Sequence, residues 1–211
     1  MTAGRVTGDD GRADRDREPR RPDVTAVEVV GGVEAFRLGL HDPDDRWPEQ
    51  YQDHRRRIGA ALASVDVQIE HIGSTSVAGL AAKPIIDLVV AVPDITAEED
   101  YLDALLAAGY RLRVREPGHR LVRTPERDVH VHLYQRGDPA VAEYLLLRDH
   151  LREDAEDRAL YERTKRDLLT RRWDRMDDYA DAKSEVILAI KARARAREAA
   201  TAREPGPSTS G

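Results

Sequence analysis

The hydrophobic pattern of this chain changes its period once, near Gly137, and this change limits the folds open to it. Before Gly137, short runs that favour strands alternate with runs that favour helices, and after it the apolar residues recur at helical spacing. A mixed sheet followed by helices is an α+β arrangement. We therefore predict a sheet core over residues 24–136 and a helical part over residues 137–195.

The expected elements are defined by residue type and by the signals at their ends. Strands are predicted over 25–30, 67–72, 84–92, 110–115, 119–123 and 128–134. Helices are predicted over 44–64, 96–110, 138–154, 155–173 and 177–200. Thr96 and Glu99 form a predicted capping box, Gly109 ends that helix, and Asp138 with Pro139 begins the next one. The last helix carries an apolar stripe of Tyr179, Val186, Ile187 and Ile190.

Length and composition define the class of protein. The 211 residues are expected to form one domain over 24–195, because residues 1–23 and 196–211 offer little apolar surface to bury. There is no cysteine, so any metal must be held by oxygen or imidazole. The 40 acidic and 34 basic residues give no global case for binding nucleic acid. No apolar run suits a membrane helix or signal sequence, and we expect a cytoplasmic protein without a membrane partner.

One acidic residue lies inside an apolar strand. Asp87 interrupts the run PIIDLVVAV, where a buried carboxylate is costly unless it is paired or bound to a cation. The preceding turn supplies a glycine and three hydroxyls: Gly73, Ser74, Thr75 and Ser76. Glycine lets the backbone approach a ligand closely, and successive amides can bind an anion. We predict that this turn binds a phosphate-bearing ligand beside Asp87.

Other polar residues are expected to converge on Asp87. Lys83 stands at the entry to the same strand, and alternation places His130 and His132 on one face of another strand. If the two strands are neighbours, two imidazoles and one carboxylate can hold a divalent metal. The alternative is that the histidines are solvated or satisfied by ordinary hydrogen bonds.

Two further groups of candidates are less tightly specified by the pattern. His71 and Glu70 precede the turn, and because side chains alternate along a strand only one of them can point toward Asp87; we expect His71. The carboxy-terminal helices carry Arg148, Lys165 and Lys183. As a group they are expected to place positive charge over a phosphate, while singly each fits an ordinary surface ion pair.

Several motifs, in order along the chain, resemble those of one family. The segment HIGSTSVAGLAAKPIIDL closely resembles the signature of the GrpB family of uncharacterised proteins, which usually has proline where this chain has Ala78. HDPDDRWP resembles the family's entry to its first helix, and DVHVHLY resembles its His-x-His strand. YLLLRDHLRED, YERTKRDL and YADAKSEVI resemble its carboxy-terminal helices. The resemblance covers most of the predicted domain and implies a nucleotidyltransferase-like mixed sheet.

The implied superfamily motif is a Gly-Ser turn followed by two carboxylates one residue apart on a strand. In this chain the turn is Gly73-Ser74, the first carboxylate is Asp87, and the second position is Val89. The resemblance implies a two-metal site in active members, which needs both carboxylates. Asp87 alone can hold at most one magnesium, and a histidine replacing the missing ligand would favour manganese or zinc.

Three functions are compatible with these residues. The first is transfer of a nucleotidyl or related phosphate-containing group from a nucleoside triphosphate to a small acceptor. Asp87 would hold Mg or Mn in that reaction, and Lys83 or His71 would neutralise charge. The second is a non-catalytic nucleotide-binding module assisting a separate partner; the resemblance implies a CoA-pathway kinase, because related domains occur fused to dephospho-CoA kinases. The third is metal-dependent hydrolysis at His130, His132 and Asp87.

Overall fold

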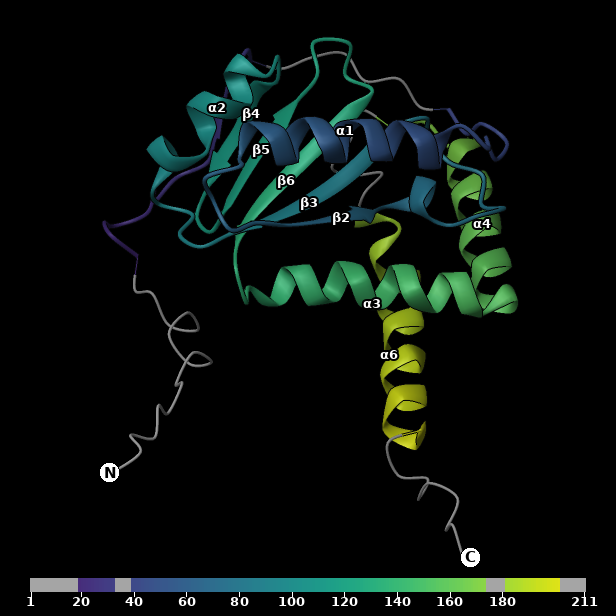
Figure 1. The fold of residues 1–211 in the computed structure, drawn as a ribbon. Coiled ribbons are helices and arrows are strands. Elements are labelled where there is room, and N and C mark those ends of the chain that lie inside the picture. The colour runs from purple at the N-terminus through teal and green to yellow at the C-terminus, as the bar shows by residue number, and fades with distance from the viewer. Residues whose placement is uncertain (1–18, 33–38, 174–180, 202–211) are drawn as a thin grey trace, which may run out of the picture.

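The computed structural model describes residues 19–32, 39–173 and 181–201, which form a six-stranded mixed sheet with flanking helices (Figure 1). Across the sheet the strands are ordered β1, β4, β5, β6, β3, β2. Their bounds are β1 (Glu28–Val29), β2 (Gln68–Ile72), β3 (Ile86–Val92), β4 (Arg111–Glu116), β5 (His119–Arg123) and β6 (Val129–Gln135). β3 and β6 are parallel, and the other neighbouring strands are antiparallel. The predicted α+β class and all six predicted strands are confirmed, although β1 is short.

The helices also follow the predicted order. They are α1 (Trp47–Ala61), α2 (Leu102–Ala107), α3 (Pro139–Glu153), α4 (Ala155–Leu169) and α6 (Ser184–Thr201), with short 3-10 helices η1 (Ser74–Ser76) and η2 (Glu98–Asp100). Asp138 caps α3 as predicted, because its carboxylate accepts from the Ala140 amide at 2.8 Å. Pro139 follows as the first helical residue.

The helix predicted over residues 96–110 is shorter than expected, and its capping box is wrong. The Thr96 hydroxyl donates to Asp94 at 2.7 Å, and the Thr96 amide donates to the same carboxylate at 2.9 Å. A local turn at Asp94 therefore takes the place of the cap, as short polar side chains often do. Gly109 ends α2 as predicted, with φ at +92°.

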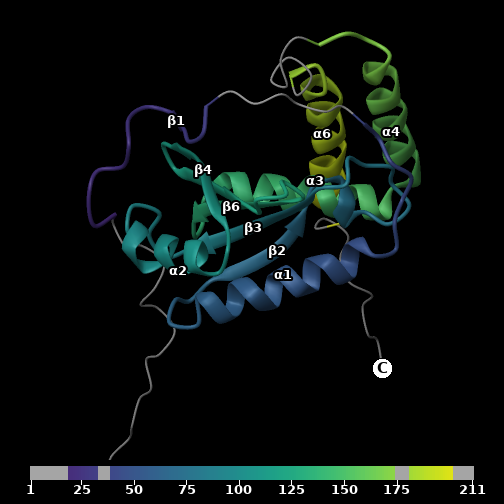
Figure 2. The same ribbon diagram turned by 90° about the horizontal axis from the view of Figure 1, so that it is seen from above.

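Alternation along β3 and β6 gives the sheet two different faces. One face presents apolar side chains to α1 and α2, and Figure 2 shows these helices on one side of the sheet with α3 on the other. The main core on the first side includes Trp47 and Ile58 from α1 and Leu88 and Val131 from the sheet. This face supplies most of the buried apolar surface of the described residues.

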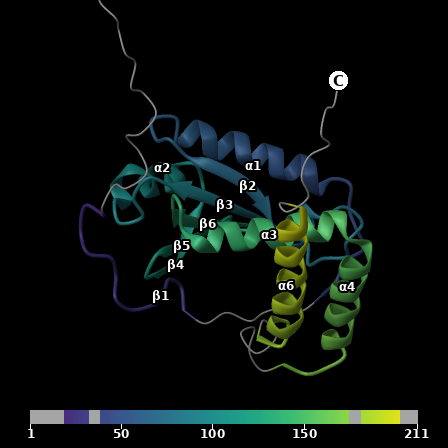
Figure 3. The same ribbon diagram turned by 90° about the horizontal axis from the view of Figure 1, so that it is seen from below.

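The carboxy-terminal helices form a second, smaller core against the segment that follows η1. This core contains Val77, Leu80, Leu151, Tyr161 and Ile190, with Leu147, Val186 and Ile187 packed against it. Figure 3 shows α3 crossing the sheet, with α4 extending from one end of α3 and α6 crossing α3 nearer its middle. Val186, Ile187 and Ile190 of the predicted stripe thus pack inward, while Tyr179 lies outside the described residues. The second core positions α4 beside the turn at 73–76.

The described fold extends beyond both expected boundaries of the domain. Asp23 accepts from the buried guanidinium of Arg120 at 2.5 Å, and α6 continues to Thr201. Over the described ranges, no helix combines the length and apolarity needed to cross a membrane.

Candidate functional site

Asp87 lies on the sheet face opposite the main core. The register pairs Asp87 of β3 with His130 of the parallel strand β6, and His132 lies two residues further along β6. His130 Nδ1 is 3.5 Å and His132 Nε2 is 3.8 Å from Asp87 Oδ1. All three potential ligand atoms lie within 4.8 Å of one another. The prediction that Asp87 and His132 share a face of one sheet is confirmed.

The surroundings of Asp87 keep its carboxylate ionised. Burial alone would raise the pKa of Asp87, but the imidazoles of His130 and His132 lower it by more. The net pKa lies far below the usual range of an aspartate. Asp87 therefore carries its negative charge throughout the physiological pH range, which is the state that a cation or a cationic side chain stabilises.

A row of hydrogen-bonded side chains reaches His132 from the neighbouring strand β5, on the same face of the sheet. His119 Nδ1 on β5 lies 2.6 Å from Glu116 Oε1, and His119 Nε2 lies 3.1 Å from His132 Nδ1. An ionised carboxylate only accepts, so the proton of His119 is on Nδ1. Because burial lowers the pKa of His119, its ring is neutral near pH 7 and its Nε2 is an acceptor.

The hydrogen bonds from Glu116 through His119 determine which nitrogen of His132 faces Asp87 without a proton. His132 Nδ1 must donate to His119, so Nε2 of a neutral His132 directs a lone pair toward Asp87 Oδ1 at 3.8 Å. Two acceptors then face each other, and a cation between them, either a proton or a metal ion, satisfies both. A carboxylate behind the ligating histidine is a common feature of metal sites.

The turn after β2 brings the backbone against Asp87. Gly73 has φ at +70°, and a Cβ atom at this position would lie 2.6 Å from Asp87 Oδ2. A side chain here would therefore be strained and would displace the carboxylate. The hydroxyls of Thr75 and Ser76 are used inside the loop, since they donate to the carbonyls of Ile85 and Gly73 at 2.9 Å and 2.6 Å.

Ser74 is the hydroxyl of the turn that is left for a ligand. Its Oγ accepts from Lys165 Nζ at 3.1 Å, so its own proton points elsewhere. The amides of Ser74 and Thr75 have no acceptor within the described residues. Burial lowers the pKa of Lys165 to about 7, and its Nζ also donates to the carbonyl of Ala81 at 2.5 Å. Lys165 thus holds the turn in place and orients Ser74.

Two more lysines lie in the electrostatic reach of Asp87. Burial lowers the pKa of Lys83 and of Lys183, while the Asp87 carboxylate acts in the opposite direction on both. Lys83 also lowers the pKa of Lys183, so the charges of the two ammonium groups act on each other. Both ammonium groups thus act on the charge of Asp87, and positive charge at this place attracts an anionic ligand.

The expected orientation of His71 is wrong. Residues 70 and 89 are register partners, so Glu70 and not His71 shares a face with Asp87. His71 instead stacks on Tyr51 of α1, with ring centroids 4.6 Å apart. Arg148 does lie on the Asp87 side, but its guanidinium is engaged by Glu70 at 2.8 Å and by the His71 carbonyl at 3.1 Å. Arg148 therefore ties α3 to the edge strand β2.

A second group of potential metal ligands is part of the helix packing. Asp157 accepts from His150 at 2.7 Å and from Arg193 at 2.9 Å. Asp154 caps α4 by accepting from the Asp157 amide at 2.9 Å. Because these carboxylates already have protein partners, we assign them to stability.

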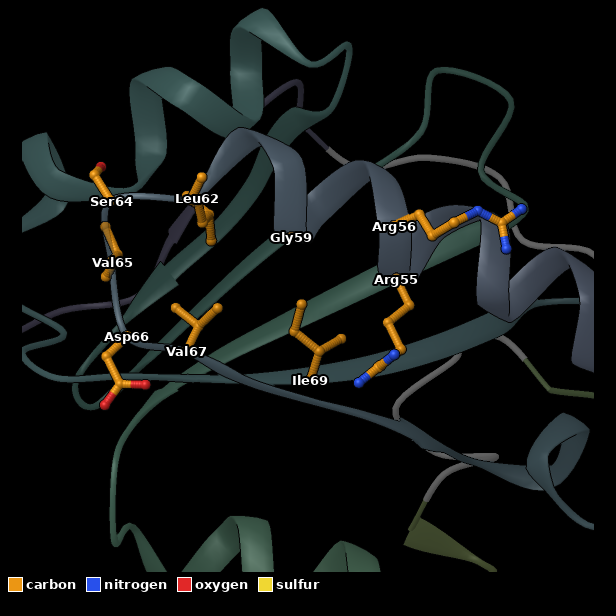
Figure 4. A pocket seen from close by; sticks show the side chains of 10 residues that line it. Arg55, Arg56, Gly59, Leu62, Ser64, Val65, Asp66, Val67 and Ile69 are labelled. Carbon is orange, nitrogen blue, oxygen red and sulfur yellow. The ribbon is translucent and has the colours of Figure 1, made fainter.

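A separate hollow of about 710 Å³ lies against the end of α1 and the beginning of β2 (Figure 4). Arg55, Arg56 and Asp66 provide its charges, and Val67 and Ile69 are among its apolar lining residues. No predicted site residue lines this hollow. It is therefore not part of the arrangement around Asp87.

Known proteins resemble this chain over most of its length. A family model described as GrpB protein matches residues 37–193. A UPF0157 protein of Streptomyces coelicolor is 72% identical over 175 residues, which cover 83% of this chain and 94% of that protein. The crystal structure of conserved protein GrpB from Enterococcus faecalis matches with a TM-score of 0.66 and 29% identity, over 75% of this chain and 98% of that one. A dephospho-CoA kinase of Mycolicibacterium paratuberculosis is 36% identical over 111 residues, covering 48% of this chain and 26% of the kinase.

Proposed function

This chain belongs to the GrpB family, and from its site we propose that it transfers a nucleotidyl or other phosphate-containing group from a nucleoside triphosphate to a small acceptor. One observation carries the proposal. The donor set of Asp87, His130 and His132 lies together on one face of the sheet, and the charge of Asp87 acts on both Lys83 and Lys183. A metal bound to a triphosphate needs both kinds of group side by side.

The side chains around Asp87 fit one divalent cation. The lone pair of His132 Nε2 and the ionised Asp87 face each other at 3.8 Å, and His130 Nδ1 completes the set at 3.5 Å from the same oxygen. Two imidazoles and a carboxylate suit manganese, cobalt or zinc better than magnesium. When bound, such a cation would neutralise the triphosphate and polarise the phosphorus under attack.

The remaining residues bind and orient the transferred group. Ser74 and the amides of the turn donate to phosphate oxygens, and Lys83 and Lys183 offset the charge that develops on the leaving pyrophosphate. The bond that forms joins an acceptor oxygen to the α-phosphorus, and the bond that breaks joins that phosphorus to the bridging oxygen of pyrophosphate. The proton of the acceptor hydroxyl passes to water beside Asp87, which solvent reaches because the side chain is 28% exposed. His71, on the opposite face, takes no part in this step.

A non-catalytic nucleotide-binding module is the second candidate. Val89 stands where the resembled motif has its second carboxylate, and it is 1% exposed beside His132 in the register. The match to part of a dephospho-CoA kinase supports a partner from the CoA pathway. In this case the same site would bind a nucleotide and the chain would assist the partner without turnover.

One screen separates the two candidates. The full chain is incubated with each common nucleoside triphosphate and either Mg²⁺ or Mn²⁺, with small alcohols as acceptors. Thermal shift reports binding, and released pyrophosphate reports transfer. We expect binding and pyrophosphate release with Mn²⁺, and loss of both in Asp87→Ala.

The matched control is Asp103→Ala, which removes an exposed carboxylate from α2 on the other side of the sheet. It should behave like the parent. Binding without pyrophosphate release in any combination would favour the module. Turnover in Asp87→Ala equal to that of the parent would overturn the assignment of the site.

A further inference from the structure

A second cavity, of about 300 Å³, lies behind the Gly73–Ser76 turn, between the beginning of α1 and the end of α3. Trp47 and Tyr51 line it from α1, His71 lines it from β2, and Arg152 lines it from α3. Asp87 does not line it, so the cavity is separate from the proposed metal site. Its volume is at the lower end of the range for small-molecule sites.

The hydrogen bonds around Thr75 determine the tautomer of His71. The single hydroxyl proton of Thr75 is donated to the Ile85 carbonyl at 2.9 Å. In its 3.2 Å contact with His71 Nε2, the Thr75 oxygen must therefore accept, and Nε2 carries the proton. Burial, and then the charge of Arg152, lower the pKa of His71 to about 4. Near pH 7 the ring is neutral, and its Nδ1 is a hydrogen-bond acceptor.

His71 Nδ1 opens into the cavity. The residue is only 6% exposed, and Nδ1 accepts no hydrogen bond from the described residues. Across the described ranges, His71 Nδ1 is not among the fully enclosed side-chain polar atoms that lack a hydrogen-bond partner. The unpaired Nδ1 of His71 must therefore border open space, and the space that this ring lines is the cavity.

Arg152 places a fixed positive charge at the same cavity. Its Nε donates to the Ser76 carbonyl at 3.0 Å and its Nη1 to Asp149 at 3.3 Å; these bonds orient the guanidinium and leave Nη2 without an acceptor among the described residues. Arg152 and His71 line the same cavity, and the charge of Arg152 lowers the pKa of His71. A guanidinium with an open N–H recognises a carboxylate.

The remaining lining residues of the cavity limit which other groups a ligand can carry. Trp47, Tyr51 and Val77 provide apolar walls, and the exposed carboxylate of Asp45 lies at the rim. A ligand that fits must offer an anionic group to Arg152 and an N–H donor to His71 Nδ1. A positive charge on that donor suits Asp45.

We propose that this cavity binds a small free amino acid, with its carboxylate on Arg152 and its ammonium group on His71 Nδ1. The ligand would touch Thr75 and Ser76, the residues whose turn holds Gly73 against Asp87. The proposal stands whether or not the Asp87 site transfers a group.

The test uses the common L-amino acids as probes on the full chain, by thermal shift and then calorimetric titration. At least one should bind with a Kd of about 1 mM or lower. Its decarboxylated analogue and its deaminated analogue, which each lack one of the two recognised groups, should bind at least about tenfold more weakly. Absence of binding across the whole set would overturn the proposal.

Three variants assign that binding to the cavity. His71→Gln keeps a donor for Thr75 but lacks the acceptor at Nδ1, and Arg152→Gln removes the guanidinium; each should weaken binding at least about tenfold. Arg163→Gln removes an exposed arginine of α4 outside the cavity and should bind like the parent. Arg152 is 41% exposed, so its variant carries the test if His71→Gln fails to fold. Unchanged binding in Arg152→Gln, or equal loss in Arg163→Gln, would contradict the proposal.

Discussion

The two faces of strands β3 and β6 are built from alternate residues of the same two segments, yet they have opposite character. Toward α1 and α2 the strands present Leu88, Val90, Val131 and Leu133, all 0% exposed. Toward the other side they present Asp87, His130 and His132, whose side chains are 28%, 24% and 19% exposed. Alternation along the strands thus separates the main apolar core from the three polar side chains around Asp87. Substitutions on the two faces should separate these two properties.

The largest effect is expected from the apolar face. Leu88→Ala should lower the free energy of unfolding by about 3 kcal/mol, because it leaves a cavity in the main core. Urea denaturation measures the loss. Divalent-ion affinity of the variant, measured well below its unfolding transition, should match that of the parent. A large loss of affinity in a folded Leu88→Ala would show that the two faces are not independent.

The buried amine of Lys165 should make stability depend on pH on the Asp87 side. Burial lowers the pKa of Lys165 to about 7 in the folded state from 10.5, so between these values the unfolded chain binds more protons and this residue makes stability rise with pH. Lys165→Met removes that dependence. The free energy of unfolding of the variant relative to the parent should therefore increase, on the order of 2 kcal/mol, as pH falls from about 9 to 7.

Urea denaturation at several pH values tests this prediction. Lys191→Met is the control, because it removes the same charge from an ion pair with Glu143 on α3. A difference between Lys165→Met and the parent that stays constant with pH would mean that the folded protein keeps Lys165 charged throughout.

A smaller effect is expected from the hydrogen bonds that link Glu116 and His119 to His132. His119→Phe retains a ring beside Tyr134 but removes the acceptor for His132 Nδ1, so the orientation of the metal ligand is lost. Divalent-ion affinity should fall at least about tenfold while the protein stays folded. Glu116→Gln keeps an acceptor oxygen for His119 and should cost less. Equal affinities in the parent, His119→Phe and Glu116→Gln would show that these hydrogen bonds do not orient the metal ligand His132.

The smallest effect concerns the choice of metal. Val89→Asp adds a carboxylate beside His132, and oxygen ligands favour magnesium relative to manganese. The ratio of Mg²⁺ to Mn²⁺ affinity should rise severalfold, at some expense in stability because Val89 is 1% exposed. Calorimetric titration with each ion gives the ratio. An unchanged ratio would place the bound ion away from position 89.

The sequence contains enough information to place Asp87, His130 and His132 together once their strands are neighbours, because period-two alternation assigns each side chain to a face. It does not contain the register. The prediction for His71 is wrong for that reason. Alternation along β2 divides its residues into two sets, but only the pairing of β2 with β3 decides which set faces Asp87. Glu116 and His119 join the site through the β4–β5 and β5–β6 pairings, which local patterns do not specify.

Local competition between hydrogen bonds accounts for other differences. Thr96 and Glu99 have the spacing of a capping box, but Asp94 lies two residues before Thr96 and takes its hydroxyl and amide protons. The turn at Gly73 likewise shows three hydroxyls in the sequence, and only the folded chain reveals that two of them donate to its own carbonyls.

The most direct test is an equilibrium Mn²⁺ titration of the parent, Asp87→Ala and Asp103→Ala, followed by electron paramagnetic resonance, with urea denaturation of the same samples. The account predicts one Mn²⁺ per chain in the parent and in Asp103→Ala. In Asp87→Ala it predicts affinity reduced at least about 100-fold in a protein that remains folded, because the side chain that it removes is 28% exposed and contributes little to packing. Equal Mn²⁺ binding by Asp87→Ala and the parent would contradict the claim that Asp87, His130 and His132 form a cation site.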